Sequence, residues 1–264
     1  MAFRNISEAA AVDYGSTDRL LVLFSSKPAM RVDQYDYKDF FQDIPHTKLY
    51  LRDKQSDYFY HTGIAGLSSS IEETVDFLKV FIKRMKPSRT TFMGTSSGGY
   101  AAMLHAHLVG ADPATRVDDV HVQSAITFID PQMRERVIGN ERTRVVFQNL
   151  ADYLASQNIE HRYSDLAPII KANPDSVRVM RMYHASGNRI DYLQVQNLAG
   201  LKNVQIVAHP STSHIMLGMV MIREGIMSRD ISMSVEDLLS ELPTEQPAAL
   251  IETADQVEAE RRMV

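Results

Sequence analysis

The residues best placed to do chemistry lie in TTFMGTSSGGYAAMLHAHL (residues 90–108), whose centre is the motif GTSSG at 94–98. A serine framed by two glycines between a strand and a helix can sit on a sharp turn, which lifts its hydroxyl clear of the sheet edge. Apolar residues before the motif predict the strand, and helical spacing after it predicts the helix. The context therefore predicts that Ser96 is a nucleophile.

Two alternatives compete for this turn. Ser97 is the rival nucleophile, but it is off-centre between the glycines; its backbone N–H would instead point to the space beside the Ser96 hydroxyl and stabilise an oxyanion. A phosphate-binding turn is the other alternative. The motif lacks the Gly-Lys-Ser/Thr of a P-loop and the Gly-x-Gly-x-x-Gly of a dinucleotide turn, so the sequence favours nucleophilic chemistry.

A serine hydroxyl needs a histidine within hydrogen-bond reach, and that histidine needs a carboxylate to orient it. His214 follows the last apolar strand by a short loop, at the edge where sites of open α/β sheets gather, and is the predicted base. His209, at the end of that strand, is the alternative, with strand capping as its structural role. The remaining candidates are expected to be packed or solvated: His46, His105, His107, His121 and His161.

Asp191 is the predicted orienting carboxylate. It follows another predicted strand, in the Gly- and Asn-containing loop of MYHASGNRIDYLQ (182–194). The structural alternative is that Asp191 caps a helix beginning at Tyr192.

These residues require a sheet whose strand ends meet at one edge. Apolar runs predict strands at 19–26, 47–53, 89–93, 116–126, 176–186 and 203–210. An amphipathic helix is predicted over 70–86, with Ser69 or Ser70 and Glu72 or Glu73 placed for a capping box. Because helical segments alternate with the strands, the sequence predicts an α/β fold with a doubly wound, mostly parallel sheet.

The spacing of the strands leaves two further segments to explain. About fifty residues separate the strands that end near 126 and begin near 176, more than a crossover requires. We expect 127–171, helical over 144–157, to be a cap-like insertion over the site; extra structural helices are the alternative. Residues 1–232 are predicted to form a single domain and 233–264 an acidic C-terminal tail.

Composition excludes several classes of function. The chain of 264 residues has a net charge of −5 and scattered cations, which do not suit nucleic acid. The absence of cysteine excludes disulfides, thiolate metal sites and a cysteine nucleophile. The N-terminus lacks the pattern of a secretory signal, and no apolar run approaches the roughly 18 residues of a membrane span. We expect a soluble, cytoplasmic protein.

The chain order Ser96, Asp191, His214 is that of one fold with this kind of turn. On that order, and on LVLFSS, KLYLRD…YFYHTGIAG, FMGTSSGGYAAML and ASGNRIDY, the sequence resembles the α/β-hydrolase superfamily over roughly 19–232. It is more narrowly similar to bacterial members that occur near polysaccharide and cell-surface glycan genes. The resemblance implies Ser96 as nucleophile, His214 as general base and acid, and Asp191 as orienting carboxylate.

The resemblance also implies an oxyanion hole. The Ser97 N–H would supply one donor, and the loop after an early strand would supply the second, which maps onto Ser25 or Ser26. There LFSSKP departs from the familiar His-Gly-Gly type of loop. Tyr60 and His61 would line the pocket or form a buried aromatic base of their loop.

The predicted function is a serine hydrolase that cleaves an ester, of an acylated glycan or a small molecule, through an acyl-enzyme. No metal or organic cofactor is implied. Acyl transfer to a sugar or other alcohol through the same intermediate is the alternative. A non-catalytic binding or scaffold module is a further alternative, against which the intact Ser, His and Asp candidates count. Substrate identity and oligomeric state depend on surface shape, which composition does not encode.

Overall fold

The predicted strands all form, and they pair into one sheet. The computed structural model describes residues 3–26, 35–53, 59–130, 141–156 and 161–241. The strands within these residues are β1 (Phe3–Asn5), β2 (Ala10–Asp13), β3 (Arg19–Phe24), β4 (Thr47–Leu51), β5 (Arg89–Thr95), β6 (Val117–Gln123), β7 (Val177–Ala185) and β8 (Val204–His209).

Helices connect the strands and cover them. Those in the described residues are α1 (Ile71–Met85), α2 (Ser97–Gly110), α4 (Glu141–Ser156), the 3-10 helix η1 (His161–Tyr163), α5 (Leu166–Ala172), α6 (Arg189–Gln196), α7 (Leu217–Arg223), α8 (Ile226–Ser232) and α9 (Val235–Ser240). None of the helices described here is long and apolar enough to cross a membrane.

The sheet is parallel except at one edge. Its strand order is β1-β2-β4-β3-β5-β6-β7-β8. The pairs β1–β2 and β2–β4 are antiparallel, and every pair from β4–β3 to β7–β8 is parallel. Val22 of β3 lies between Leu49 of β4 and Phe92 of β5. The predicted mostly parallel, doubly wound sheet is confirmed, and the carboxyl ends of the parallel strands share one edge.

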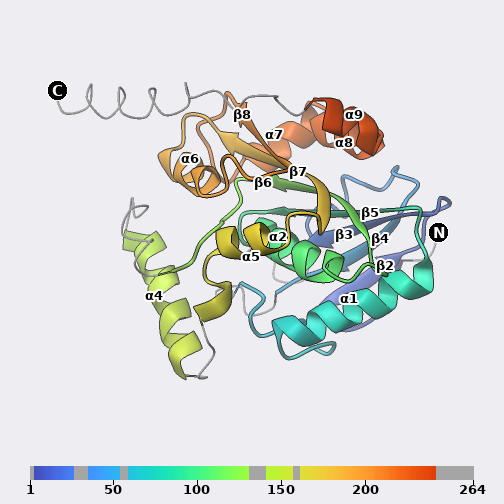
Figure 1. Cartoon of the computed structure of the whole chain (residues 1–264), viewed down its shortest axis with the longest axis horizontal. Coiled ribbons are helices and arrows are strands. Elements are labelled where there is room, and N and C mark those ends of the chain that lie inside the picture. Colours follow the sequence, from blue (N-terminus) through green and yellow to red (C-terminus); the bar gives the residue numbers. More distant parts are fainter. Residues whose placement is uncertain (1–2, 27–34, 54–58, 131–140, 157–160, 242–264) are drawn as a thin grey trace.

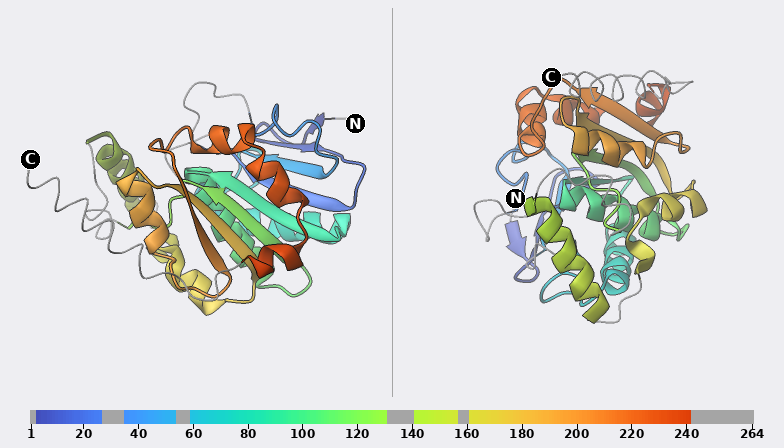
Figure 2. Two further views of the ribbon diagram at one scale, coloured as in Figure 1. Left: turned by 90° about the horizontal axis from the view of Figure 1, so that it is seen from above. Right: turned by 90° about the vertical axis from the view of Figure 1, so that its left-hand side faces the viewer.

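Both faces of the sheet are buried, as continuous apolar strands require. Leu20 and Val22 pack into the core that includes α1 and α2, whereas Leu21 and Leu23 pack into the core that includes α7 and α8. Figure 1 shows α1, α2 and α5 on one side of the sheet, and Figure 2 shows α7 and α8 crossing the strands on the other. Alternate side chains of β3 therefore pack into the two hydrophobic cores on opposite faces of the sheet.

The insertion between β6 and β7 contains the helices α4, η1 and α5. Phe147, Leu150 and Leu154 of α4 are buried, and the Phe147 ring stacks on Phe59 with their centroids 5.9 Å apart. Figure 1 shows α4 beside the edge from which α2 starts. Residues 131–140 and 157–160 of the predicted cap lie outside the described residues. That the insertion covers a site stays a prediction.

The segment expected to be an acidic tail begins with packed structure. Val235 and Leu238 of α9 pack against Val179 of β7, because this six-residue helix has an apolar side despite its acidic first turn. The packed chain therefore continues past the predicted domain limit at residue 232. Residues 242–264 lie outside the described residues.

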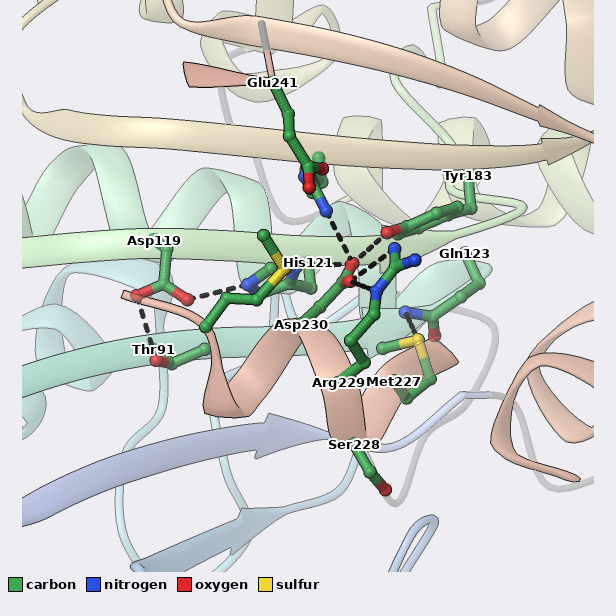
Figure 3. Close-up of polar contacts among 12 residues, drawn as sticks. Thr91, Asp119, His121, Gln123, Tyr183, Met227, Ser228, Arg229, Asp230 and Glu241 are labelled. Atoms are coloured by element: carbon green, nitrogen blue, oxygen red, sulfur yellow. Dashed lines mark hydrogen bonds and ion pairs between the residues drawn. The ribbon is translucent and has the colours of Figure 1, made fainter. Parts of the chain in front are cut away.

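A buried charged network fastens α8 to the sheet (Figure 3). His121 Nε2 lies 2.7 Å from the Asp119 carboxylate, and Arg181 Nη1 lies 3.2 Å from Asp230 of α8. The Tyr183 hydroxyl donates to the same Asp230. Burial alone would raise the pKa of Asp119, but the hydrogen bond from His121 contributes to lowering it to about 2. Through Asp230, these contacts hold α8 against β7.

Candidate active site

Ser96 lies on a strained turn between β5 and α2. Its backbone angles are φ 53° and ψ −119°, a conformation with positive φ that costs energy in a residue with a side chain. The Ser96 N–H donates to the Gln123 carbonyl of β6 at 3.0 Å. The carbonyl of Ser96 accepts from Tyr100 at 3.1 Å, so both sides of the turn are fixed by backbone bonds.

Glycines are required here by close backbone approach. A Cβ atom on Gly94 would lie 2.2 Å from the Gly98 carbonyl oxygen, and one on Gly98 would lie 2.3 Å from the Phe24 carbonyl oxygen. Neither distance can accommodate a side chain. The two glycines therefore let β3, β5 and the first turn of α2 meet at one point, where Ser96 is presented.

The structure brings His214 to Ser96. The Ser96 Oγ and His214 Nε2 atoms are 2.9 Å apart, although the two residues are 118 positions apart in the chain. The His214 side chain is 27% exposed, which leaves room for a reacting group beside it. His209, the alternative base, instead contacts Glu224, with its Nε2 atom 2.9 Å from the carboxylate.

Asp191 completes a continuous row of hydrogen bonds. Its Oδ1 atom lies 2.5 Å from His214 Nδ1, and the Asp191 side chain is only 1% exposed. The helix α6 is capped by Asn188, whose side-chain oxygen accepts the N–H groups of Ile190 and Asp191. Asn188 therefore caps α6, and the Asp191 carboxylate is available to bind the His214 imidazole.

Ser124 supports Asp191 and was not among the residues predicted from the sequence. Its hydroxyl donates to the second Asp191 oxygen at 2.5 Å, and the Ala185 N–H lies 3.4 Å from the same atom. Ser124 follows β6 directly and has a positive φ of 43°. The only sequence signal for Ser124 is that a small polar residue follows a strand at this edge of the sheet. Many other serines occupy similar positions, so this signal does not single out Ser124.

The expected second oxyanion donors lie close to the turn, with their N–H groups already bonded. Ser25 N–H donates to the Leu51 carbonyl at 2.9 Å. Ser26 N–H and its hydroxyl both donate to Asp36, each at 2.7 Å. Burial raises the pKa of Asp36, and the two bonds from Ser26 oppose that effect. Ser26 could bind an oxyanion only by exchanging Asp36 for it.

Tyr60 and His61 are buried beneath this loop. The Tyr60 hydroxyl donates to the Ser25 carbonyl at 2.6 Å, and its ring is fully enclosed. His61 is 4% exposed, with Nε2 at 3.2 Å from the Tyr100 hydroxyl. The Tyr60 contact supports the Ser25 loop, whereas the His61 contact joins this segment to α2.

The described part of the chain contains no group of three or more His, Cys, Asp or Glu side chains arranged to hold a metal ion. Among the remaining histidines, His105 and His107 are buried in α2, and each Nδ1 atom lies 2.8 Å from a carbonyl of the preceding turn. Burial lowers the pKa of each to about 4, so both are neutral structural groups.

Solved structures share this architecture. A capsule O-acetyltransferase of Neisseria meningitidis serogroup A superposes with a TM-score of 0.59 at 14% identity, covering 84% of this chain and 90% of its own. A hydrolase from Pseudomonas aeruginosa PA01 gives 0.51 at 13% identity, with 88% and 98% covered. The chain has the α/β-hydrolase fold. MenH from S. aureus also superposes, with a TM-score of 0.51 at 11% identity and 84% and 96% covered.

No family model and no curated protein sequence matches the chain, so the likeness to known proteins lies in the fold. In α/β-hydrolase terms the turn at Ser96 has the geometry of the nucleophile elbow, and Ser96, Asp191 and His214 follow in the order of that fold. The arrangement can accept a proton from the serine hydroxyl at His214 Nε2 while Asp191 holds the proton on Nδ1.

Proposed function

We propose that the protein is a serine hydrolase that cleaves esters through an acyl-enzyme. The observation that carries the proposal is the unbroken row of hydrogen bonds from Ser96 through His214 to the buried Asp191. A serine at the surface of a turn needs no such row. A nucleophile needs it, because the hydroxyl becomes reactive only when a base accepts its proton.

The proposed reaction has two halves. The Ser96 oxygen attacks the ester carbonyl carbon while His214 Nε2 accepts the hydroxyl proton; the ester C–O bond then breaks, and His214 gives that proton to the leaving alcohol. Water next attacks the acyl-enzyme and loses a proton to His214, which returns it to Ser96 as the carboxylic acid leaves. Asp191 stays ionised and stabilises the imidazolium formed in each half.

We propose that the start of α2 stabilises the negative charge that develops on the carbonyl oxygen during the attack. Ser97 is the first residue of this fourteen-residue helix, where backbone N–H groups and the positive end of the helix dipole favour an anion. The Ser26 N–H is the proposed second donor if substrate displaces Asp36. In that case Asp36 regulates access to the oxyanion hole.

A fluorophosphonate probe tests the proposal directly, because it labels only an activated hydroxyl. We expect stoichiometric labelling that peptide mapping assigns to Ser96, and loss of labelling in Ser96→Ala. Ser97→Ala, the matched control next in sequence, should still be labelled. Equal far-UV circular dichroism of the variants would show that folding is unchanged. Labelling elsewhere, or labelling that survives in Ser96→Ala, would reject the proposed nucleophile.

A second candidate function is acyl transfer to an alcohol, such as a sugar hydroxyl. It is favoured by the TM-score of 0.59 with a capsule O-acetyltransferase, of which a mutant was solved in complex with CoA with a TM-score of 0.55. The two functions share the acyl-enzyme and differ in what attacks it. Turnover of acetyl-CoA and of p-nitrophenyl acetate should be measured with and without oligosaccharides. Acceptor-dependent turnover with acylated sugar as product would favour transfer.

A further inference from the structure

A polar cleft lies at the edge of the sheet opposite to Ser96. It has a volume of about 200 Å³ and includes the hydroxyl-bearing Ser88 and Ser234 in its wall. Its walls also carry four arginines, each at or beside the start of a different parallel strand: Arg19 (β3), Arg89 (β5), Arg116 (β6) and Arg178 (β7). In a chain whose net charge is −5, this is a local concentration of positive charge.

Parallel strands explain why the arginines meet. Because β3, β5, β6 and β7 run in the same direction, residues at their starts lie along one edge. Strand β5 has seven residues from Arg89 to Thr95, so at about 3.3 Å per residue the cleft lies about 20 Å from Ser96. An occupant of the cleft is therefore separate from any acyl group on the serine.

The ion pairs leave part of the positive charge available. Arg89 is not available to a ligand, because its Nε and Nη2 atoms donate to both oxygens of the buried Asp119. Arg19, by contrast, forms no ion pair with any residue that the structure describes. Burial lowers the pKa of His46 to about 4, and the charge of Arg19 adds to this effect, as expected for a positive local potential.

Two carboxylates, Asp118 and Glu236, also face the cleft and offset part of its positive charge. Asp118 is 4% exposed and accepts from Arg116 at 2.7 Å and from the Thr90 N–H at 3.0 Å. Arg178 Nη1 lies 3.7 Å from the same Asp118 carboxylate. Glu236 pairs with Arg178 at 2.9 Å, but the Glu236 side chain is 72% exposed. An exposed pair of this kind contributes little, so Glu236 can turn into solvent and leave the Arg178 Nη2 donor to another anion.

We propose that this cleft binds the dianionic phosphate group of a small soluble molecule, held by Arg19, Arg116 and Arg178. A planar guanidinium group can donate two parallel hydrogen bonds to the oxygens of one phosphate, and it is weakly hydrated for its charge. The volume is below the range of pockets that enclose a whole drug-sized ligand. It suits a phosphate group whose organic part extends into solvent.

Isothermal titration calorimetry at pH 7.5, with ionic strength held constant by sodium chloride, tests the proposal with two probes. Inorganic phosphate and glucose 6-phosphate share the dianion, and tighter binding of the monoester would identify a phosphate carried on an organic molecule. We expect saturable binding of one equivalent. Each of Arg19→Ala, Arg116→Ala and Arg178→Ala should weaken it about tenfold, the usual effect of losing one charged hydrogen bond.

Two control variants show whether phosphate binds in the cleft itself. Arg162→Ala removes an exposed arginine that pairs with Glu72 on another surface, and it should bind phosphate as the wild type does. Ser96→Ala should also bind normally, so this test can succeed or fail whatever the outcome of the fluorophosphonate experiment. Circular dichroism would confirm that each variant is folded. No saturable binding, or equal affinity in the three cleft variants and Arg162→Ala, would overturn the proposal.

Discussion

Mild acid should destabilise this protein through two histidines inside α2. His105 and His107 are 0% and 3% exposed, and burial lowers the pKa of each from 6.5 to about 4. Between these two values the unfolded chain binds protons that the folded chain excludes. The free energy of unfolding therefore decreases as pH falls from about 6.5 towards 4.

The size of the effect follows from the two pKa values. At pH 5 an unfolded imidazole is almost fully protonated, while the folded one is mostly neutral. Since one pKa unit corresponds to about 1.4 kcal/mol, each histidine should remove about 2 kcal/mol of stability between pH 7 and pH 5. The pair would remove about 4 kcal/mol, a large part of the 5–15 kcal/mol that stabilises a typical domain.

Urea unfolding at pH 7, 6 and 5 measures this loss, followed by far-UV circular dichroism because the chain has no tryptophan. His107→Gln cannot take up the proton, so it should lose about 2 kcal/mol less than the wild type over this range. His209→Gln, which changes a histidine at the end of β8 that contacts Glu224, is the matched control. Equal unfolding free energies of the wild type at pH 7 and 5, or equal pH dependence of the two variants, would refute the reasoning.

Further outcomes are expected for the candidate active site, four from variants and one from the wild type. Asp191→Asn should lower kcat for ester hydrolysis by about 10⁴-fold, because the imidazole loses its orienting charge. Ser124→Ala should lower kcat about tenfold, since Asp191 would lose its 2.5 Å hydroxyl bond; an unchanged kcat would make Ser124 merely structural. His214→Ala should abolish turnover while His209→Ala retains it, and wild-type activity should rise with pH because only a neutral imidazole accepts the serine proton. Replacing 127–171 by a short linker should change relative rates among ester substrates while the probe still labels Ser96.

Local patterns made much of the fold predictable. The amphipathic helix expected over 70–86 is observed as α1, and its cap is resolved: Ser70 accepts the Glu73 N–H, while the Glu73 carboxylate accepts from Ser69. These signals lie within one turn of the chain, so sequence spacing determines them. The parallel strands were equally readable, because burial on both faces requires an unbroken apolar run.

The strands β1 and β2 were not predicted, and the reason is physical. Strand β2 has the sequence Ala-Ala-Val-Asp, and alanine has little intrinsic preference for strands. It forms because Ala10 pairs with Leu51 of β4, about forty residues away. The residues of β1 are all exposed and carry no burial pattern. Long-range pairing, rather than local composition, makes these two strands.

The residues of the candidate site were predictable where the sheet topology brings the ends of their strands together. Strands β5, β6, β7 and β8 are neighbours in the same order in the sheet and in the chain, and each contributes one residue at or after its carboxyl end: Ser96, Ser124, Asp191 and His214. A search of strand ends therefore finds Ser96, Asp191 and His214, whose residue types and sequence motifs indicate catalysis. It passes over Ser124 and over the bond between Ser26 and Asp36, because serine and aspartate are common in loops.

The return of the chain from β8 is what brings the base to the nucleophile. Strands β5 and β8 are three positions apart, about 14 Å at the usual spacing of strands, too far for one imidazole to bridge. After His209 the chain turns back, and the Gly187 N–H of the β7 loop holds the Ser211 carbonyl at 3.1 Å. The start of α7 then lies over β5, where a Cβ atom on Gly218 would be 3.1 Å from Thr95 Oγ1. His214 stands between these two anchors, so the path of the loop places its imidazole beside Ser96.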